Sequence, residues 1–249
     1  MADFVSARKR DGVSTATIRR DLACGSIAFS LANDWEWADR NPFRDYRKRT
    51  LPEATPRTRV LTEAEREAIL AAYKVAPNII KACWLTGMRI GELCALERKD
   101  VDFERGEILV RDSKNRRPRI VPLDEEGLAH FRAQKFSTSV KWMFWWGPGK
   151  PYTVEQVSRA FNRAAKRAGV KDARLHDTRH TFASDRISRG MDLYTLGKIL
   201  GHSTPNQTAK YAHLQVQAMK EAMARTSRLV DTKTGTVITD FSADVGKDE

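Results

Sequence analysis

The chain has 249 residues, of which 41% are hydrophobic and 31% charged, a balance typical of a globular protein that buries a core of its own. No apolar run approaches the roughly 20 residues of a membrane helix, and the start lacks the apolar stretch of a signal peptide, so we expect a cytoplasmic protein without a membrane partner. The formal net charge of +12 is typical of a protein with a polyanionic partner such as nucleic acid, and charge alone leaves a merely basic surface as an equal alternative.

The first predicted element is a helix over about 14–37. Ser14 is a suitable N-cap, and a rough apolar face is marked by Ile18, Leu22, Ile27, Phe29 and Leu31. Residues 47–59 are polar, basic and interrupted by two prolines, which is typical of a linker. We therefore expect a first domain with its linker over 1–57, a second domain over 58–230, and a tail over 231–249 that is partly β-prone and then acidic.

The second domain has a mainly helical pattern with one β-hairpin. Thr62 and Glu65 have the spacing of a capping box at its start. Two β-prone runs flank a polar turn within 107–123 (EILVRDSKNRRPRIVPL), which predicts the hairpin. Helices are predicted over about 78–87, 89–96, 124–135, 153–168, 176–189, 192–200 and 205–229, with Gly169, Gly190 and Gly201 near helix ends. The fold class is therefore mainly α with a small antiparallel hairpin or sheet (α+β).

Three cysteines, Cys24, Cys83 and Cys94, are scattered without the spacing of metal ligands. The sequence predicts that they are reduced, buried thiols and gives no sign of a metal site. The aromatic run at 142–147 (WMFWWG) is expected to pack or to contact another subunit rather than to stack on nucleic-acid bases.

Arg89 and the pair His176 and Arg179 have spacings suited to holding an anion. Arg89, in LTGMRIGEL, lies near the start of a short helix, where free backbone amides and a guanidinium both suit phosphate oxygens, and Glu92 can orient that guanidinium. His176 and Arg179 lie three positions apart and project from one helix face. Taken singly, each has an ordinary interpretation as a surface ion pair or a solvated face.

The hairpin turn and the segment 199–214 (ILGHSTPNQTAKYAHL) contribute further candidates. Lys114 lies in the turn and can serve as a point charge or proton donor. The simpler interpretation is that this lysine only forms a basic surface that touches backbone phosphates, together with Arg111, Arg116, Arg117 and Arg119. His202 follows Gly201, and Tyr211 lies nine residues later. As a nucleophile, tyrosine needs nearby cations and a group that accepts its proton.

The ordered set Arg89, Lys114, His176, Arg179, His202 and Tyr211 resembles the catalytic residues of the tyrosine recombinase (phage integrase) family. The resemblance covers about residues 60–214, and 1–57 resembles the end of the family's helical core-binding domain, in a shortened form. Two departures stand out: Thr178 takes a place where the family often has leucine, and the hairpin turn lacks a glycine often found there, so Arg116 rivals Lys114.

The resemblance implies a site-specific recombinase that cleaves DNA through a 3′-phosphotyrosyl intermediate at Tyr211 and integrates or excises a prophage or mobile element. Arg89, Arg179 and His202 would bind the phosphate oxygens, Lys114 would protonate the leaving oxygen, and His176 would accept the tyrosine proton. The implied partner is double-stranded DNA, with four protomers bound to two duplexes, whereas the protein free in solution is expected to be a monomer. The tail is expected to contact a neighbouring subunit, and no cofactor is implied. A type IB topoisomerase-like enzyme and a non-catalytic DNA-binding protein of the same fold remain alternatives.

Overall fold

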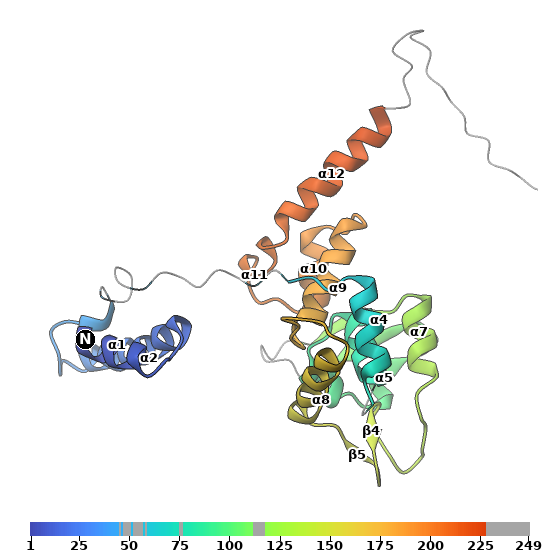
Figure 1. Cartoon of the computed structure of the whole chain (residues 1–249), viewed down its shortest axis with the longest axis horizontal. Coiled ribbons are helices and arrows are strands. Elements are labelled where there is room, and N and C mark those ends of the chain that lie inside the picture. The colour runs from blue at the N-terminus through green and yellow to red at the C-terminus, as the bar shows by residue number, and fades with distance from the viewer. Residues whose placement is uncertain are drawn as a thin grey trace, which may run out of the picture. The chain divides into compact units, whose positions relative to one another are not determined.

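The computed structural model describes residues 1–44, 46, 51, 57, 59–74, 77–111 and 118–227. Most of the predicted linker, the hairpin turn with Lys114, and the tail 231–249 lie outside the described residues. The chain divides into two compact units, Met1–Arg57 and Thr58–Glu249 (Figure 1). None of the helices in the described part of the chain is long and apolar enough to cross a membrane.

In its described residues the first unit has the helices α1 (Ala2–Arg10) and α2 (Thr15–Asp34), and residues 42–44 are also helical. The side chain of Ser14 accepts a hydrogen bond from the backbone of Thr17, which confirms the predicted cap. The sequence did not predict α1, and α2 ends three residues before the expected position. The small core of the first unit consists of Val5, Ile18, Leu22 and Leu51.

The expected apolar face of α2 is only partly correct. Ile18 and Leu22 are fully buried, but Ile27, Phe29 and Leu31 are exposed. Phe29 contacts Phe43, with ring centroids 5.3 Å apart, but none of the three residues belongs to the described core of this unit. Cys24 on the same helix is also exposed, which contradicts its prediction as a buried thiol, whereas Cys83 and Cys94 in the second unit are buried.

The second unit packs helices around a small antiparallel sheet. Its elements are α4 (Glu63–Ala72), α5 (Pro77–Thr86), α6 (Ile90–Cys94), the 3-10 helix η1 (Arg98–Asp100), β1 (Val101–Asp102), β2 (Glu107–Val110), β3 (Arg119–Pro122), α7 (Glu125–Arg132), β4 (Trp145–Trp146), β5 (Lys150–Pro151), α8 (Val154–Arg167), α9 (Asp177–Ser188), α10 (Leu193–Leu200), α11 (Asn206–Ala209) and α12 (Ala212–Ser227). These elements confirm a mainly helical α+β fold.

The predicted hairpin is confirmed as β2 and β3, and β1 adds a third strand in the order β1-β2-β3. The register pairs Ile108 with Val121, both fully buried on the core side of the sheet. Arg119 lies two residues before Val121 and therefore projects from the same side of β3. A charged side chain is thus directed toward the core.

Helix α9 lies at the centre of this unit, packed against α5, α10 and α12 (Figure 1). Nine of its side chains are buried, and they include Asp177, Arg179 and His180. Buried charged and titratable side chains are rare unless they have partners. The position of α9 therefore indicates a polar cluster built into the core.

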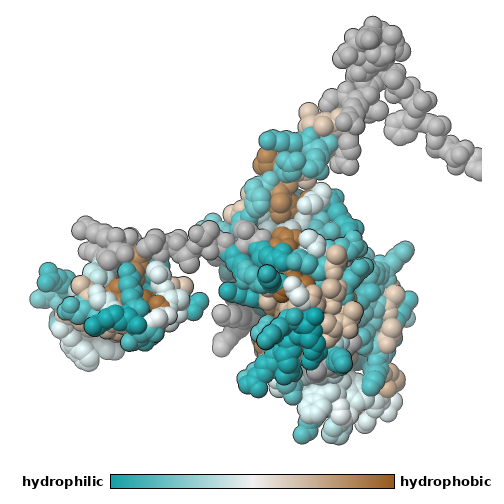
Figure 2. Space-filling model, in the orientation of Figure 1, coloured by the Kyte–Doolittle hydropathy of each residue, from teal (hydrophilic) through white to brown (hydrophobic). Residues whose placement is uncertain are grey.

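The segment predicted as one helix over 205–229 is instead two helices. Helix α11 ends at Ala209, α12 begins at Ala212, and Lys210 and Tyr211 form the turn between them. Helix α12 packs on α9 near its start, where Leu214 contacts the core. Further along, α12 exposes Val216, Met219 and Met223. Figure 2 shows hydrophobic surface on this helix. The turn allows Tyr211 to be buried while α12 continues outward.

The aromatic run at 142–147 packs in part, as expected. Met143 and Phe144 are buried, and the Phe144 ring meets Phe131 edge on, with centroids 5.6 Å apart. Trp145 and Trp146 form the short strand β4, which pairs with β5, and Trp146 is exposed.

Candidate active site

Arg179 is buried in the described structure, with 4% of its surface exposed. Its Nη1 donates to the carbonyl of Gly87, after α5, at 2.8 Å, and its Nη2 donates to the carbonyl of Leu200, at the end of α10, at 2.6 Å. Burial and the nearby charge of Arg89 lower the pKa of Arg179 to about 9, so the guanidinium stays charged at neutral pH. The side chain therefore fixes a positive charge between two loops that are distant in sequence.

Arg89 reaches the same region from the start of α6. Its backbone amide donates to Glu92 Oε2 at 2.9 Å and its Nη1 to Glu92 Oε1 at 3.0 Å, which confirms that Glu92 orients the guanidinium. Its Nη2 donates to the carbonyl of Gly201 at 3.2 Å. Arg89 and Arg179 thus contact consecutive carbonyls, those of Gly201 and Leu200, at the end of α10.

Arg119 belongs to this site, although the sequence predicted it only as part of a basic surface. Its side chain is only 8% exposed, and its Nη1 and Nη2 donate to the two oxygens of Glu92 at 3.0 and 2.6 Å. Its Nε donates to the carbonyl of Ile199 at 2.7 Å. Its burial could have been predicted from the alternation of side chains along β3, because Arg119 and buried Val121 project from the same side of that strand.

His202 is held by the turn that ends α10. Gly201 adopts φ +66°, a left-handed conformation that favours glycine, and ends the helix as predicted. The His202 Nδ1 lies 2.7 Å from the hydroxyl of Thr208. Burial, together with the charges of Arg179, Lys210, Arg89 and Arg119, lowers the pKa of His202 to about 3. The imidazole is therefore neutral at physiological pH, and one of its ring nitrogens has a fixed partner.

Tyr211 is buried, with 5% of its surface exposed, and its hydroxyl lies 2.6 Å from His180 Nδ1. Burial raises the pKa of Tyr211 to about 12, and the positive charge of Arg179 offsets part of that rise. The Lys210 Nζ lies 3.2 Å from the same nitrogen of His180 and 5.0 Å from the centre of the Tyr211 ring. Tyr211 therefore belongs to a hydrogen-bonded group rather than to a purely apolar core.

The hydrogen-bond partner of Tyr211 differs from the one expected. The family resemblance implies His176 as the acceptor of its proton, but His180, one helical turn further along α9, contacts the hydroxyl. The ring of His176 instead meets the ring of His180 edge on, with centroids 4.9 Å apart. Both residues lie on the same face of α9, so spacing alone did not distinguish them.

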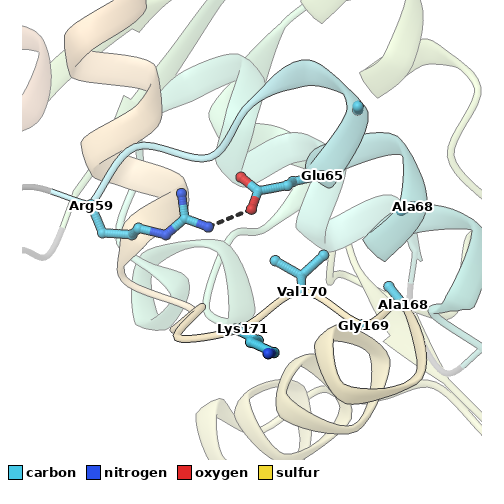
Figure 3. A pocket seen from close by; sticks show the side chains of 8 residues that line it. Arg59, Glu65, Ala68, Ala168, Gly169, Val170 and Lys171 are labelled. Carbon is cyan, nitrogen blue, oxygen red and sulfur yellow. Dashed lines mark hydrogen bonds and ion pairs between the residues drawn. The ribbon is translucent and has the colours of Figure 1, made fainter.

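A separate surface hollow lies between the start of α4 and the segment after α8 (Figure 3). Arg59 and Glu65 form an ion pair on its wall, and Lys171 projects from the opposite segment. Its lining residues all lie outside the predicted catalytic set. The polar cluster around α9 is therefore separate from this hollow.

Residues 59–218 match the family model described as "Phage integrase family". Tyrosine recombinase XerC of Corynebacterium glutamicum is 32% identical over 149 residues, which are 58% of this chain and 48% of that relative. Tyrosine recombinase XerA of Pyrococcus furiosus is 27% identical over 238 residues, which are 91% of this chain and 79% of that relative.

Solved structures agree with this match. The Tn1549 transposon integrase in complex with circular intermediate DNA has a TM-score of 0.70 at 27% identity, covering 84% of this chain and 78% of the integrase chain. A lambda integrase dimer bound to a COC′ core site shares the fold, with a TM-score of 0.69 at 20% identity over 83% of this chain and 78% of that chain. Since the family match covers well over half of the residues, the chain belongs to the phage integrase family and carries a tyrosine recombinase catalytic domain.

Proposed function

We propose that this recombinase breaks and rejoins double-stranded DNA at specific sites, with Tyr211 as the nucleophile. The observation that carries the proposal is the meeting of three distant motifs at the end of α10. Arg89 and Arg179 donate to the carbonyls of Gly201 and Leu200, His202 follows directly, and Tyr211 is held nearby through α9. A net charge of +12 suits a phosphate backbone as ligand.

The two guanidinium groups and His202 would bind the non-bridging oxygens of the scissile phosphate. Negative charge grows on these oxygens as the phosphorus becomes five-coordinate, and donors fixed in advance stabilise that charge without reorganising. With its Nδ1 accepting from Thr208, a neutral His202 presents Nε2–H as a donor. Each guanidinium supplies a planar pair of donors that matches two phosphate oxygens.

In the reaction, a bond forms between Tyr211 Oη and phosphorus while the bond from phosphorus to the 5′ oxygen breaks. The departing oxygen takes a proton, for which Lys114 is the proposed donor on the basis of the resemblance. The new phosphotyrosyl ester retains the energy of the broken bond. The 5′-hydroxyl of another strand can therefore attack it and complete an exchange.

The more specific role that we propose is integration or excision of a prophage or mobile element by four protomers on two duplexes. The similarity to a transposon integrase supports the integrase part of this role, and the four protomers are proposed from the family resemblance. A type IB topoisomerase-like activity shares the chemistry but requires no pairing of two sites. A non-catalytic DNA-binding protein would need neither Tyr211 nor the arginine pair.

The test is covalent selection from DNA duplexes with a randomised sequence and a nick in one strand. The nick lets the short 5′-hydroxyl fragment leave, so the phosphotyrosyl adduct is trapped and survives denaturation. Wild type is expected to enrich one family of sequences, Tyr211→Phe to yield no adduct, and Tyr194→Phe, which changes an exposed tyrosine on α10, to behave as wild type. Equal yields from wild type and Tyr211→Phe would refute the proposed function.

A second experiment separates the two enzyme classes. Two copies of the selected sequence are placed on one supercoiled plasmid, and the products are separated by electrophoresis. A recombinase yields deletion or inversion products that depend on both copies. Relaxation of the plasmid without these products would favour the topoisomerase alternative.

A further inference from the structure

Two proton donors approach one ring nitrogen beside the proposed nucleophile. The Tyr211 hydroxyl lies 2.6 Å and the Lys210 Nζ 3.2 Å from Nδ1 of His180. A neutral imidazole nitrogen carries either one proton or one lone pair, so Nδ1 cannot accept fully from both groups. The shorter distance favours the hydroxyl as the principal donor, with Lys210 as a competitor.

The surroundings of His180 keep its ring neutral. Burial lowers the pKa of His180 to about 4, aided by the positive charges of Lys210 and Arg179 and by His176, while Asp177 opposes the shift. Burial and the charge of Arg179 also lower the pKa of Lys210. A neutral His180 has a free lone pair at Nδ1 when the proton resides on Nε2, so it can accept the phenolic proton.

We propose that His180 is the catalytic proton acceptor for Tyr211 and that Lys210 is a positioning residue that keeps this acceptor weakly basic. The inference deepens the proposed function and rests on it. As the bond from Tyr211 Oη to phosphorus forms, the phenolic proton moves to His180 Nδ1, and the bond to the 5′ oxygen breaks. His176, expected from the sequence to receive this proton, packs against the ring of the acceptor instead.

The lysine gives this arrangement a property that a histidine alone would lack. Once His180 holds the proton, an imidazolium faces the Lys210 ammonium across a short distance, and like charges disfavour that state. In rejoining, a 5′-hydroxyl attacks the phosphorus and gives its proton to the group that protonated the leaving oxygen during cleavage. The bond from phosphorus to Tyr211 Oη breaks, and the proton on His180 therefore returns readily to that oxygen. A weak base of this kind keeps cleavage and rejoining balanced, as an exchange of strands requires.

The test measures the rate of adduct formation against pH on the duplex recovered by the covalent selection. His180→Asn retains a side-chain oxygen near the position of Nδ1 but cannot take up a proton at neutral pH. We expect it to slow cleavage by about 100-fold or more, in keeping with the loss of a general base. Lys210→Met is expected to move the acid limb of the profile upward by about one pH unit and to slow rejoining relative to cleavage.

Lys198→Met is the matched control, because Lys198 also lies over a tyrosine ring, that of Tyr194, at 5.1 Å. We expect it to leave the pH profile unchanged. In the free protein, nitrogen NMR of the histidines should show the titration of His180 at higher pH in Lys210→Met than in wild type. This second measurement does not depend on cleavage.

The outcomes distinguish the two proposals. A wild type that forms no adduct refutes the proposed function itself. If the wild type forms the adduct and His180→Asn forms it at a rate within about threefold of the wild-type rate, only the assignment of His180 is refuted. A Lys210→Met protein with an unshifted His180 titration and an unshifted rate profile refutes the role of Lys210.

Discussion

The Arg119 guanidinium and the Glu92 carboxylate form a buried, bidentate ion pair. Nη1 meets Oε1 at 3.0 Å and Nη2 meets Oε2 at 2.6 Å, and the two side chains are 8% and 6% exposed. Burial alone would raise the pKa of Glu92, but the hydrogen bonds and charges of Arg119 and Arg89 outweigh it and hold that pKa below its usual value. One carboxylate thus holds two arginines, from β3 and from α6.

Removing Arg119 should therefore cost far more stability than removing a surface arginine. In Arg119→Met, Glu92 loses its principal partner while remaining buried, and we expect a loss of about 3–5 kcal/mol in the free energy of unfolding. Arg119→Lys should recover part of the loss, since an ammonium cannot engage both oxygens in parallel. Chemical denaturation measures these values.

The matched control for this prediction is Arg159→Met. Arg159 pairs with Glu155 at 2.5 Å, but the two side chains are 70% and 71% exposed. Its loss should change the free energy of unfolding by less than about 1 kcal/mol. Similar losses for both variants would contradict the structural role assigned to Arg119.

Local features of the sequence predicted much of the fold. The capping box of Thr62 and Glu65, the hairpin of 107–123 and the end of α10 at Gly201 depend on neighbouring residues, whose chemistry is visible in the sequence. The pairing of Arg89 with Glu92 was also predictable, because three positions span one helical turn.

Contacts between distant segments could not be predicted from the sequence. The bond of Tyr211 to His180 joins residues 31 apart, and that of Arg119 to Glu92 joins residues 27 apart. The helix break at Lys210 and Tyr211 carries no proline or glycine and arises because the tyrosine ring is buried while α12 extends outward. Tertiary packing therefore decided which histidine meets the proposed nucleophile.

Gly201 should tolerate no side chain. Its φ of +66° disfavours any other residue, and an added Cβ would lie 2.9 Å from Arg119 Nη1 and 3.0 Å from Arg119 Cδ and Cζ, in a side chain fixed by Glu92. Gly201→Ala should therefore lose stability and also displace His202. Gly169→Ala is the control, because Gly169 has a φ of +70° with nothing within 4 Å of the added Cβ.

We expect Gly169→Ala to cost about 1–2 kcal/mol from backbone strain alone. Gly201→Ala should cost more and should also slow adduct formation, which Gly169→Ala should not affect. Thermal unfolding and the adduct assay report the two effects separately. Equal behaviour of the two variants would show that Arg119 yields easily to the added methyl group.

Thr208 should act on the reaction through His202. Its hydroxyl lies 2.7 Å from His202 Nδ1 and is buried, so it fixes both the ring orientation and the nitrogen left to face the phosphate. Thr208→Val keeps the shape but removes the hydroxyl, and we expect adduct formation to slow by about 10-fold or more. Thr208→Ser should restore most of the rate, and a serine variant as slow as the valine variant would argue against the hydrogen bond as the cause.

The stability of the protein should fall as the pH is lowered from about 7 toward 4. The pKa values of His130, His176, His180 and His202 are all lowered, chiefly by burial, with His180 at about 4 and His202 at about 3. Below the ordinary histidine pKa of about 6.5, the unfolded chain binds protons that the folded chain does not. Their contribution is therefore complete above that pH and is lost progressively as the pH falls toward the folded values.

Each such histidine contributes a slope of at most about 1.4 kcal/mol per pH unit in this window. Denaturation curves measured at several pH values between 7 and 5, above the range where most carboxylates titrate, should show this slope. In His180→Asn the slope should be smaller, because one group that binds a proton only in the unfolded chain is gone. A free energy of unfolding that stays constant from pH 7 to pH 5 would mean that these rings take up protons without unfolding, and the neutral His180 on which proton transfer from Tyr211 depends would be lost.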